Sequence, residues 1–247
     1  MKPILFLTSI LDVYDRDKSG NKIPKNFGNY NHILDNFRKY IKKYDHFLFV
    51  ASDETNTTAT DDYANAVFQS FSLTLPFKSY HVLDIRSENK AKELIKQADF
   101  IYLCGGHLPS QNQFFNKIHL KELMQDTTAV ICGISAGSMN SAEDVYSAPE
   151  LEGESIDPAF KRSLPGLGLT NLNILPHYKA FRNHVLDGRK YVKDIILPDS
   201  YSRTIYALYD GSYFLVTPEK TYLYGKSYLI QNGKIKRLNL FRRIKMF

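Results

Sequence analysis

The sequence predicts a three-layer α/β domain, in which helices cover both faces of an open, mostly parallel β-sheet. Through most of the chain, short apolar runs rich in β-branched and aromatic residues alternate with longer amphipathic segments, a rhythm typical of crossovers between parallel strands. The last part of the chain instead carries short strand-like runs joined by turns such as Asn232-Gly233, which indicates antiparallel strands. The 247 residues show no repeat or linker, so we expect a single domain over residues 1–247.

The expected elements follow one another in a regular order up to the middle of the chain. Apolar residues at i, i+3 and i+4 identify the helices, and short apolar runs identify the strands. They are a strand at 4–8, a helix through Ile33, Leu34, Phe37 and Ile41, a strand at 47–51, a helix at 58–75, a strand at 80–85, a helix at 88–98, a strand at 99–104, a helix at 111–124 and a strand at 128–132.

A long segment rich in Pro, Gly and Ser, residues 147–170, interrupts this order after a helix expected at 136–145. Long irregular loops inside a domain are commonly functional. The remaining expectations are a strand at 171–175, a helix at 184–197, a strand at 204–208, and short antiparallel strands at 213–216, 221–224, 228–231 and 235–240.

Composition excludes several classes of protein. Hydrophobic residues make up 43% of the chain and charged residues 23%, without an apolar stretch of 18 residues, so no membrane span is expected. Aspartates follow the first apolar run where a signal peptide would need small neutral residues, so we interpret that run as a strand. Cys104 and Cys132 lie in apolar runs and are too few for a disulfide framework, which favours a cytoplasmic protein.

The chain has a formal charge of +6, and its densest basic segment lies near the C-terminus, at residues 234–237 and 242–245. Apolar Ile235, Leu238, Leu240 and Ile244 alternate with the basic residues, a pattern typical of a strand with one solvated face. Because no nucleic-acid-binding motif accompanies this segment, we expect no nucleic-acid partner.

The pentapeptide Gly-Ile-Ser-Ala-Gly at residues 133–137 follows the strand expected at 128–132. It fits a nucleophile elbow, in which a serine stands on a strained turn between a strand and a helix. Ser135 is therefore the candidate nucleophile. A serine needs a base within hydrogen-bonding distance, and that base needs an acid to orient it.

His177 is the candidate base because it ends an apolar strand, where open α/β sheets gather their chemistry. We expect His32, His46, His81, His119 and His184 to be surface or packing residues. Asp210, which ends another strand, is the preferred orienting acid, and Glu150 in the long loop is the alternative. The chain order Ser135, His177, Asp210 differs from the Ser, Asp, His order of α/β-hydrolases.

Two backbone amides are candidates for an oxyanion hole, which must stabilise the negative charge of a tetrahedral intermediate. The residue after the nucleophile supplies one N–H group, here that of Ala136. The second is expected from Gly106, since Gly105-Gly106 ends the strand before the elbow and a missing side chain lets the backbone approach a substrate.

The elbow, the upstream Gly-Gly and the Leu-Pro-His sequence at residues 175–177 together resemble the dipeptidase E (aspartyl dipeptidase) and cyanophycinase family of serine peptidases. The resemblance covers residues 2–216 and implies a flavodoxin-like fold related to class I glutamine amidotransferases. It implies the same roles for Ser135, His177, Gly106 and Ala136, with a third triad member that varies between the positions of Glu150 and Asp210.

The resemblance also bears on the substrate, which we expect to be a small peptide such as an Asp-Xaa dipeptide. In aspartyl dipeptidases an arginine on the helix after the histidine pairs with the substrate aspartate, and Arg189 is the candidate here. His107 stands where the family usually has Asn or Asp, and it is a second candidate substrate-binding residue.

No metal or dinucleotide cofactor is expected, because the chain has neither paired metal-ligand spacing nor Gly-x-Gly-x-x-Gly. Three alternatives stay open: hydrolysis of β-aspartyl polymers, hydrolysis of other amides or esters, and a catalytically silent ligand-binding protein on the same fold. The protein is expected to be a monomer or a homodimer without a membrane partner.

Overall fold

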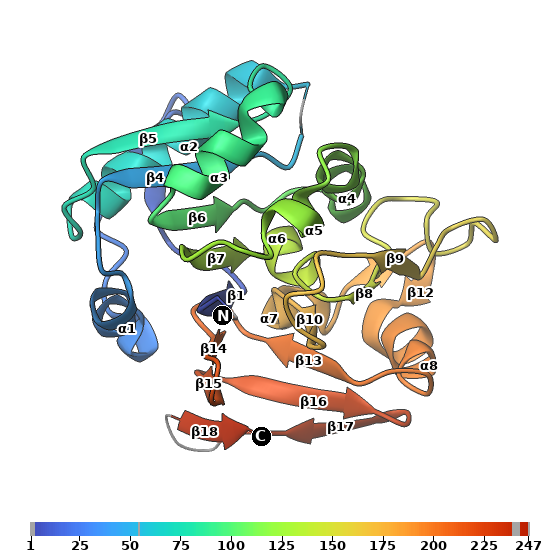
Figure 1. Cartoon of the computed structure of the whole chain (residues 1–247). Helices are drawn as coiled ribbons and strands as arrows, with labels where there is room; N and C mark the ends of the chain where they lie inside the picture. The colour runs from blue at the N-terminus through green and yellow to red at the C-terminus, as the bar shows by residue number, and fades with distance from the viewer. Residues whose placement is uncertain (1–2, 54, 239–242, 247) are drawn as a thin grey trace.

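The main sheet has eight strands in the order β18-β15-β14-β1-β7-β6-β4-β5 (Figure 1). The computed structural model describes residues 3–53, 55–238 and 243–246. Five strands are parallel: β5 (Ser79–Leu83), β4 (His46–Val50), β6 (Phe100–Leu103), β7 (Val130–Ile134) and β1 (Leu5–Thr8). Three antiparallel strands extend the sheet beyond β1: β14 (Tyr213–Val216), β15 (Thr221–Tyr224) and β18 (Arg243–Met246). The predicted α/β class with C-terminal antiparallel strands is confirmed.

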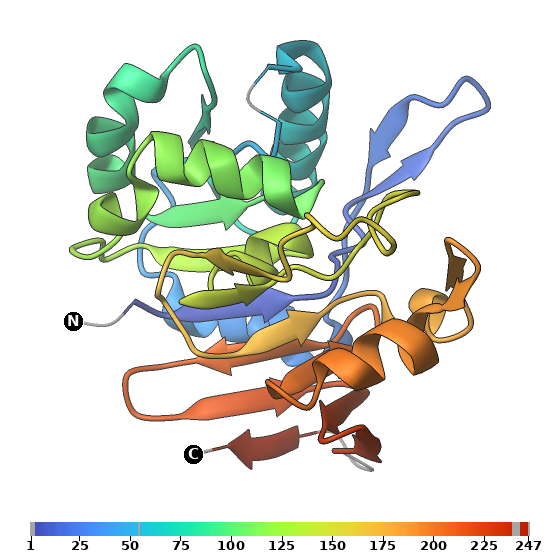
Figure 2. The same ribbon diagram turned by 90° about the vertical axis from the view of Figure 1, so that its right-hand side faces the viewer.

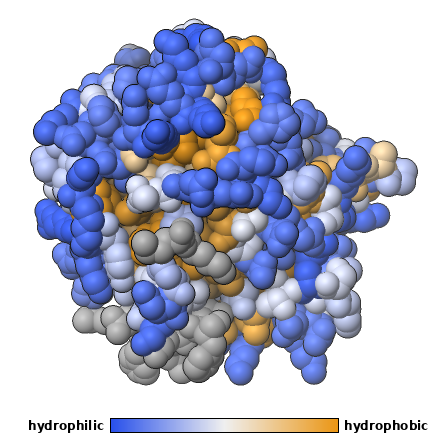
Figure 3. Space-filling model, in the orientation of Figure 1, coloured by the Kyte–Doolittle hydropathy of each residue, from blue (hydrophilic) through white to orange (hydrophobic). Residues whose placement is uncertain are grey.

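Helices cover both faces of this sheet (Figure 2). One face packs against α1 (Ile33–Tyr40) and α2 (Thr57–Ser72), which follow the short 3₁₀ helix η1 (Tyr30–His32) and β4 respectively. The other face packs against α3 (Ala91–Gln97), α4 (Leu108–Lys117) and α5 (Leu120–Leu123), with the 3₁₀ helix η2 (Glu88–Lys90) before α3. Hydrophilic residues cover most of the surface in Figure 3, with hydrophobic ones recessed between them.

The two faces of the parallel strands differ in chemistry, because successive side chains along a strand point to opposite sides. In β6, Phe100 and Tyr102 join the cluster under α1 and α2, whereas Ile101 and Leu103 join the cluster under α3 to α5. In β1, Phe6 likewise faces the aromatic side. On β4 and β6 this alternation places aromatic side chains under α1 and α2 and aliphatic ones under α3 to α5.

A second sheet lies beside the first, with four strands in the order β10-β13-β16-β17. Its members are β10 (Asn173–Leu175), the parallel β13 (Ile205–Leu208), and the antiparallel β16 (Ser227–Gln231) and β17 (Lys234–Arg237). These strands were predicted from the sequence, but their separation from the main sheet was not. A π-helix (Tyr191–Ile196) and α8 (Leu197–Asp199) pack against this sheet through apolar side chains.

The helix expected at 136–145 is much shorter than predicted. α6 spans only Ala136–Met139, and β8 (Asp144–Tyr146) then pairs with β9 (Ser163–Pro165) inside the predicted loop. The carbonyls of Asn140, Ser141 and Ala142 accept hydrogen bonds from the amides of residues 167–170. The backbone groups that would continue the helix are thus paired with a distant loop.

The prediction of a helix at 184–197 is also wrong for the first half of that segment. After α7 (Tyr178–Phe181), the chain forms a hairpin of β11 (Val185–Leu186) and β12 (Arg189–Lys190). Asp187 and Gly188 both have positive φ, 52° and 75°, the conformation that two-residue hairpin turns require. Arg189 therefore lies on a strand. The helix expected at 111–124 is similarly divided at His119, whose φ is 53°.

Two further segments differ from the sequence analysis. A hairpin of β2 (Tyr14–Arg16) and β3 (Lys22–Pro24) was not predicted. The strand expected at 235–240 corresponds to β17, which ends at Arg237 and is exposed along its length, while residues 239, 240 and 242 lie outside the described residues. In the part of the chain that the structure describes, no helix is both long and apolar enough to cross a bilayer.

Candidate active site

Ser135 lies at the turn between β7 and α6, with φ 49° and ψ −112°. Such a conformation is costly for a residue with a side chain and persists only where the surroundings enforce it. The Ser135 amide donates to Thr8 O at 3.1 Å, and a Cβ on Gly137 would lie 2.2 Å from Leu103 O. Helix α6 therefore approaches β6 so closely that only glycine fits at position 137, and this packing holds Ser135 in the strained turn.

His177 follows β10 and points its imidazole at Ser135. The distance from His177 Nε2 to Ser135 Oγ is 3.2 Å. The residue has φ 54°, and its backbone amide donates to Ser9 Oγ at 2.8 Å. A backbone hydrogen bond thus fixes the turn that carries the imidazole.

Asp210 follows β13 and contacts the other imidazole nitrogen. Asp210 Oδ1 lies 2.8 Å from His177 Nδ1, while the side chain is half exposed. The hydrogen bond from His177, helped by one from Ser9, holds the pKa of Asp210 below its usual value despite partial burial. Glu150, the alternative acid, has no such hydrogen bond to His177 among the described residues.

Ser9 is a site residue that the sequence analysis missed. It follows β1 and is fully buried. Its Oγ donates to Asp210 Oδ1 at 2.8 Å and accepts the His177 backbone N–H. Its position after the first apolar strand was the available signal, since parallel strands present their carboxyl ends at one edge.

Two backbone amides flank the nucleophile. A Cβ built on Gly105 would lie 3.4 Å from Ser135 Cβ, so the loop after β6 abuts Ser135. A Cβ on Gly106 would lie 2.2 Å from Ser52 Oγ, which explains the glycine there. Within the described residues, neither the Gly106 nor the Ala136 amide donates to another backbone or side-chain group. Both amides are available to a bound group.

A pocket of about 280 Å³ opens beside Ser135 and His177. Its walls are mostly apolar, and they carry the carboxyl group of Glu150. Burial raises the pKa of Glu150 to about 7. The lining residues are Ser135, Met139, Ala148, Glu150, Leu151, Leu175, Pro176, His177, Phe181 and Tyr191.

The two predicted substrate-binding residues contact the loop that carries Glu150 and do not line this pocket. His107 Nε2 lies 3.1 Å from Glu154 Oε1, and Arg189 Nη1 donates to Ser155 O at 3.1 Å. Asp187 also contacts this loop, since its carboxylate accepts from the Gly153 and Ser155 amides. These side chains hold the loop between the segment after β6 and the β11–β12 hairpin.

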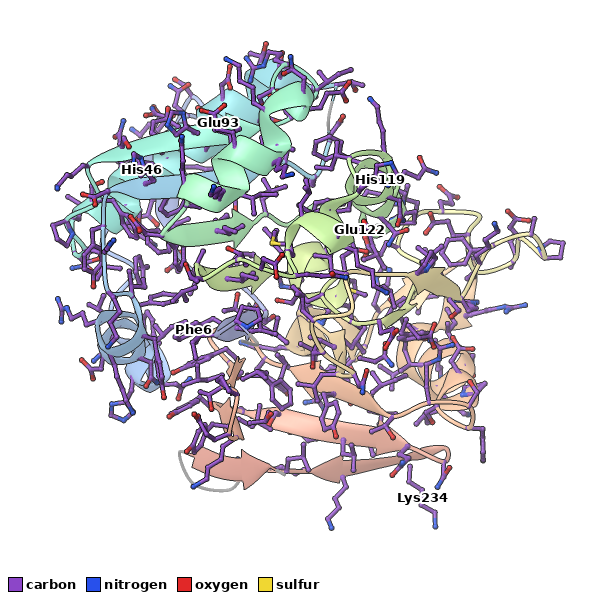
Figure 4. The ribbon with its side chains drawn as sticks, in the orientation of Figure 1. Phe6, His46, Glu93, His119, Glu122 and Lys234 are labelled. Carbon is purple, nitrogen blue, oxygen red and sulfur yellow. The ribbon has the colours of Figure 1, made fainter. Side chains whose placement is uncertain are left out.

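The other histidines lie on different elements. Figure 4 labels His46 on β4 and His119 beside α5. His32, His81, His119 and His184 are exposed, and His46 Nδ1 lies 3.2 Å from Ser79 Oγ. Among the described residues, no group of three or more His, Cys, Asp or Glu side chains is arranged to hold a metal ion.

Comparison with known proteins adds two findings. The model of the family described as Peptidase family S51 matches residues 19–223. A crystal structure from Listeria monocytogenes EGD-e, whose description names peptidase E, is 17% identical, covers 96% of this chain and 99% of its own, and superposes with a TM-score of 0.56. At that identity the likeness shows a shared fold. The search of curated proteins returned no match.

Proposed function

The chain belongs to peptidase family S51 and is a serine-type peptidase, and we propose that it cleaves small peptides through an acyl-enzyme on Ser135. The observation that carries this proposal is the chain of contacts from Ser135 Oγ to His177 Nε2 and from His177 Nδ1 to Asp210 Oδ1. Nucleophile, base and orienting acid in that sequence are what acyl transfer needs.

In the proposed reaction, His177 Nε2 takes the proton of Ser135 Oγ while the oxygen bonds to the substrate carbonyl carbon. Asp210 stabilises the resulting imidazolium. The Gly106 and Ala136 amides donate to the oxyanion. The C–N bond then breaks as His177 gives the proton to the leaving amine, and a water molecule, deprotonated by His177, hydrolyses the acyl-enzyme.

The direct test is labelling with a fluorophosphonate, which reacts with an activated serine. We expect labelling of Ser135 in the wild-type protein and none in Ser135→Ala, which should also lose turnover while keeping its melting temperature. Asp210→Asn should lower kcat by about 10⁴-fold, because the amide can donate to His177 Nδ1 and hold the imidazole in the wrong tautomer. A folded wild-type protein that is never labelled would instead favour a silent binding protein.

For the substrate, the family resemblance favours an Asp-Xaa dipeptide, with Arg189 as the partner of the aspartate side chain. A guanidinium suits a carboxylate, and Arg189 is exposed on the hairpin next to the Glu150 loop. Hydrolysis of Asp-Ala faster than of the neutral Asn-Ala would support this preference. β-Aspartyl polymers and simple esters belong in the same panel, because one site can serve each of these acyl transfers.

A further inference from the structure

The pocket beside Ser135 combines apolar walls with one acidic side chain. Among the lining residues that the structure describes, Glu150 is the only carboxylate, and there is no lysine or arginine. Burying a carboxylate without a cation or hydrogen-bond donors is costly. His177 is the one described lining residue that can become cationic, and its two ring nitrogens already contact Ser135 and Asp210.

In the loop that carries Glu150, Glu154 makes the hydrogen bonds that hold the backbone, and the Glu150 side chain is partly buried. Glu154 Oε2 accepts the backbone amides of Glu150 and Leu151, at 2.7 and 2.9 Å, and Glu154 Oε1 contacts His107. Glu154 thus has its partners, whereas the Glu150 carboxyl forms no hydrogen bond with another described residue. The titratable groups that interact electrostatically with the Glu150 carboxyl are His107, Glu154, His177 and Tyr191.

The aromatic wall supplies a second feature suited to a cation. Phe181 and Tyr191 both line the pocket. Aromatic faces attract ammonium and guanidinium groups, most strongly where water is excluded. The raised pKa of Glu150 agrees with this view, because an arriving cation would favour the ionised carboxylate.

We propose that Glu150 binds a positively charged nitrogen of the substrate. This inference rests on the proposed function, because it takes the group next to Ser135 to be part of the peptide being cleaved. The nitrogen is either the free α-ammonium group of the residue that acylates Ser135 or the end of its lysine or arginine side chain. Both present the same chemistry to the pocket.

The test measures equilibrium binding by calorimetry to the Ser135→Ala protein, so that it does not depend on turnover. The probes are Lys-Ala, norleucyl-Ala and their N-acetylated forms. If the α-ammonium group is the ligand, Glu150→Gln in this background should weaken binding of the two free peptides by about 10- to 100-fold, the loss expected for a charge-assisted hydrogen bond, and leave their N-acetylated forms nearly unchanged. If the side chain is the ligand, the substitution should weaken the two lysine peptides by that factor and leave the two norleucine peptides nearly unchanged. Discrimination between free and acetylated peptides identifies the α-amine, and discrimination between lysine and norleucine identifies the side chain.

Glu152→Gln is the matched control, since Glu152 lies in the same loop with an exposed side chain; it should change none of these affinities. Glu150→Asp should keep part of the discrimination. An equal loss for cationic and neutral peptides in Glu150→Gln would indicate a structural role and overturn the inference, and so would unchanged binding. Failure of the proposed function appears separately, as wild-type protein that is neither labelled by fluorophosphonate nor active on these peptides.

Discussion

At the scale of single residues, Ser9 connects two of the proposed triad members. Its hydroxyl donates to the Asp210 carboxylate and accepts the backbone N–H of His177. These two bonds position the acid and the base relative to each other without touching the reacting atoms. We therefore expect Ser9 to act as a positioning residue, whose loss lowers the rate more than the substrate affinity.

We expect Ser9→Ala to lower kcat by about 10- to 100-fold with little change in KM, because each lost hydrogen bond to a buried or charged group costs about 1–3 kcal/mol. Steady-state kinetics and the pH dependence of kcat check this. Ser70→Ala is the control: Ser70 is equally buried and its Oγ donates to Lys25 O, away from Ser135, His177 and Asp210. If both variants lose stability and activity alike, Ser9 has only a structural role.

The sequence alone located most of the candidate site. Ser135, His177 and Asp210 each end a predicted strand, and the structure brings the three together. Ser9 was not predicted as a site residue, because a serine after a strand belongs to no recognisable motif. Its hydrogen bonds also depend on two loops that are distant in sequence. The contacts of His107 and Arg189 could not be predicted from the sequence either, because their partners, Glu154 and Ser155, belong to the long irregular loop.

At the scale of elements, the pattern of apolar residues predicted strands and long helices well, and it failed where backbone groups pair across the chain. β14 and β15 have the predicted bounds, and α2 differs from its prediction by a few residues. α6 is short because its next carbonyls bond to residues 167–170. The Asp187-Gly188 turn was visible in the sequence, but the apolar residues on both sides of it also fit a helix.

The aromatic layer between the main sheet and α2 gives an element-scale prediction. Phe47 on β4 is fully buried, and its ring lies 5.2 Å from that of Phe71 on α2 and 5.1 Å from that of Phe100 on β6. Phe47→Ala should lower the free energy of unfolding by about 3–5 kcal/mol, through lost burial and the cavity left behind. Denaturant titration measures this.

Leu73→Ala provides the comparison, because Leu73 stands just after α2 and is 60% exposed. Its free energy of unfolding should stay within about 0.5 kcal/mol of the wild type, as for most surface substitutions. Equal effects of the two substitutions would contradict the view that the aromatic layer joins α2 to the sheet.

At the scale of the whole molecule, the site is assembled from two sheets. Ser9 and Ser135 follow β1 and β7 of the main sheet, whereas His177 and Asp210 follow β10 and β13 of the second. The hydrogen bonds of Ser9 and His177 cross between these sheets. This arrangement could not be predicted from the pattern of strands, because the residues of a strand do not determine which sheet the strand joins.

The stability of the whole molecule should depend on pH through Glu150. Burial raises the pKa of its carboxyl from 4.5 to about 7, so between these values the folded protein holds a proton that the unfolded chain releases. Folding is then opposed increasingly as pH rises from about 4.5 to 7, and the effect is constant above that range. At about 1.4 kcal/mol for each pKa unit, the full destabilisation is of the order of 3 kcal/mol.

Glu150→Gln removes this titration, so its free energy of unfolding relative to the wild type isolates Glu150 from every other ionisable group. We expect the free energy of unfolding of the variant to rise relative to that of the wild type between pH 4.5 and 7, by about 1–3 kcal/mol in total. Above pH 7 the difference should stay constant. Denaturant unfolding at pH 4.5, 6, 7 and 8 measures the difference. A difference that does not change with pH would mean that the Glu150 carboxyl ionises as freely in the folded protein as in the unfolded chain, and the pocket beside Ser135 would then be far more polar than its apolar lining indicates.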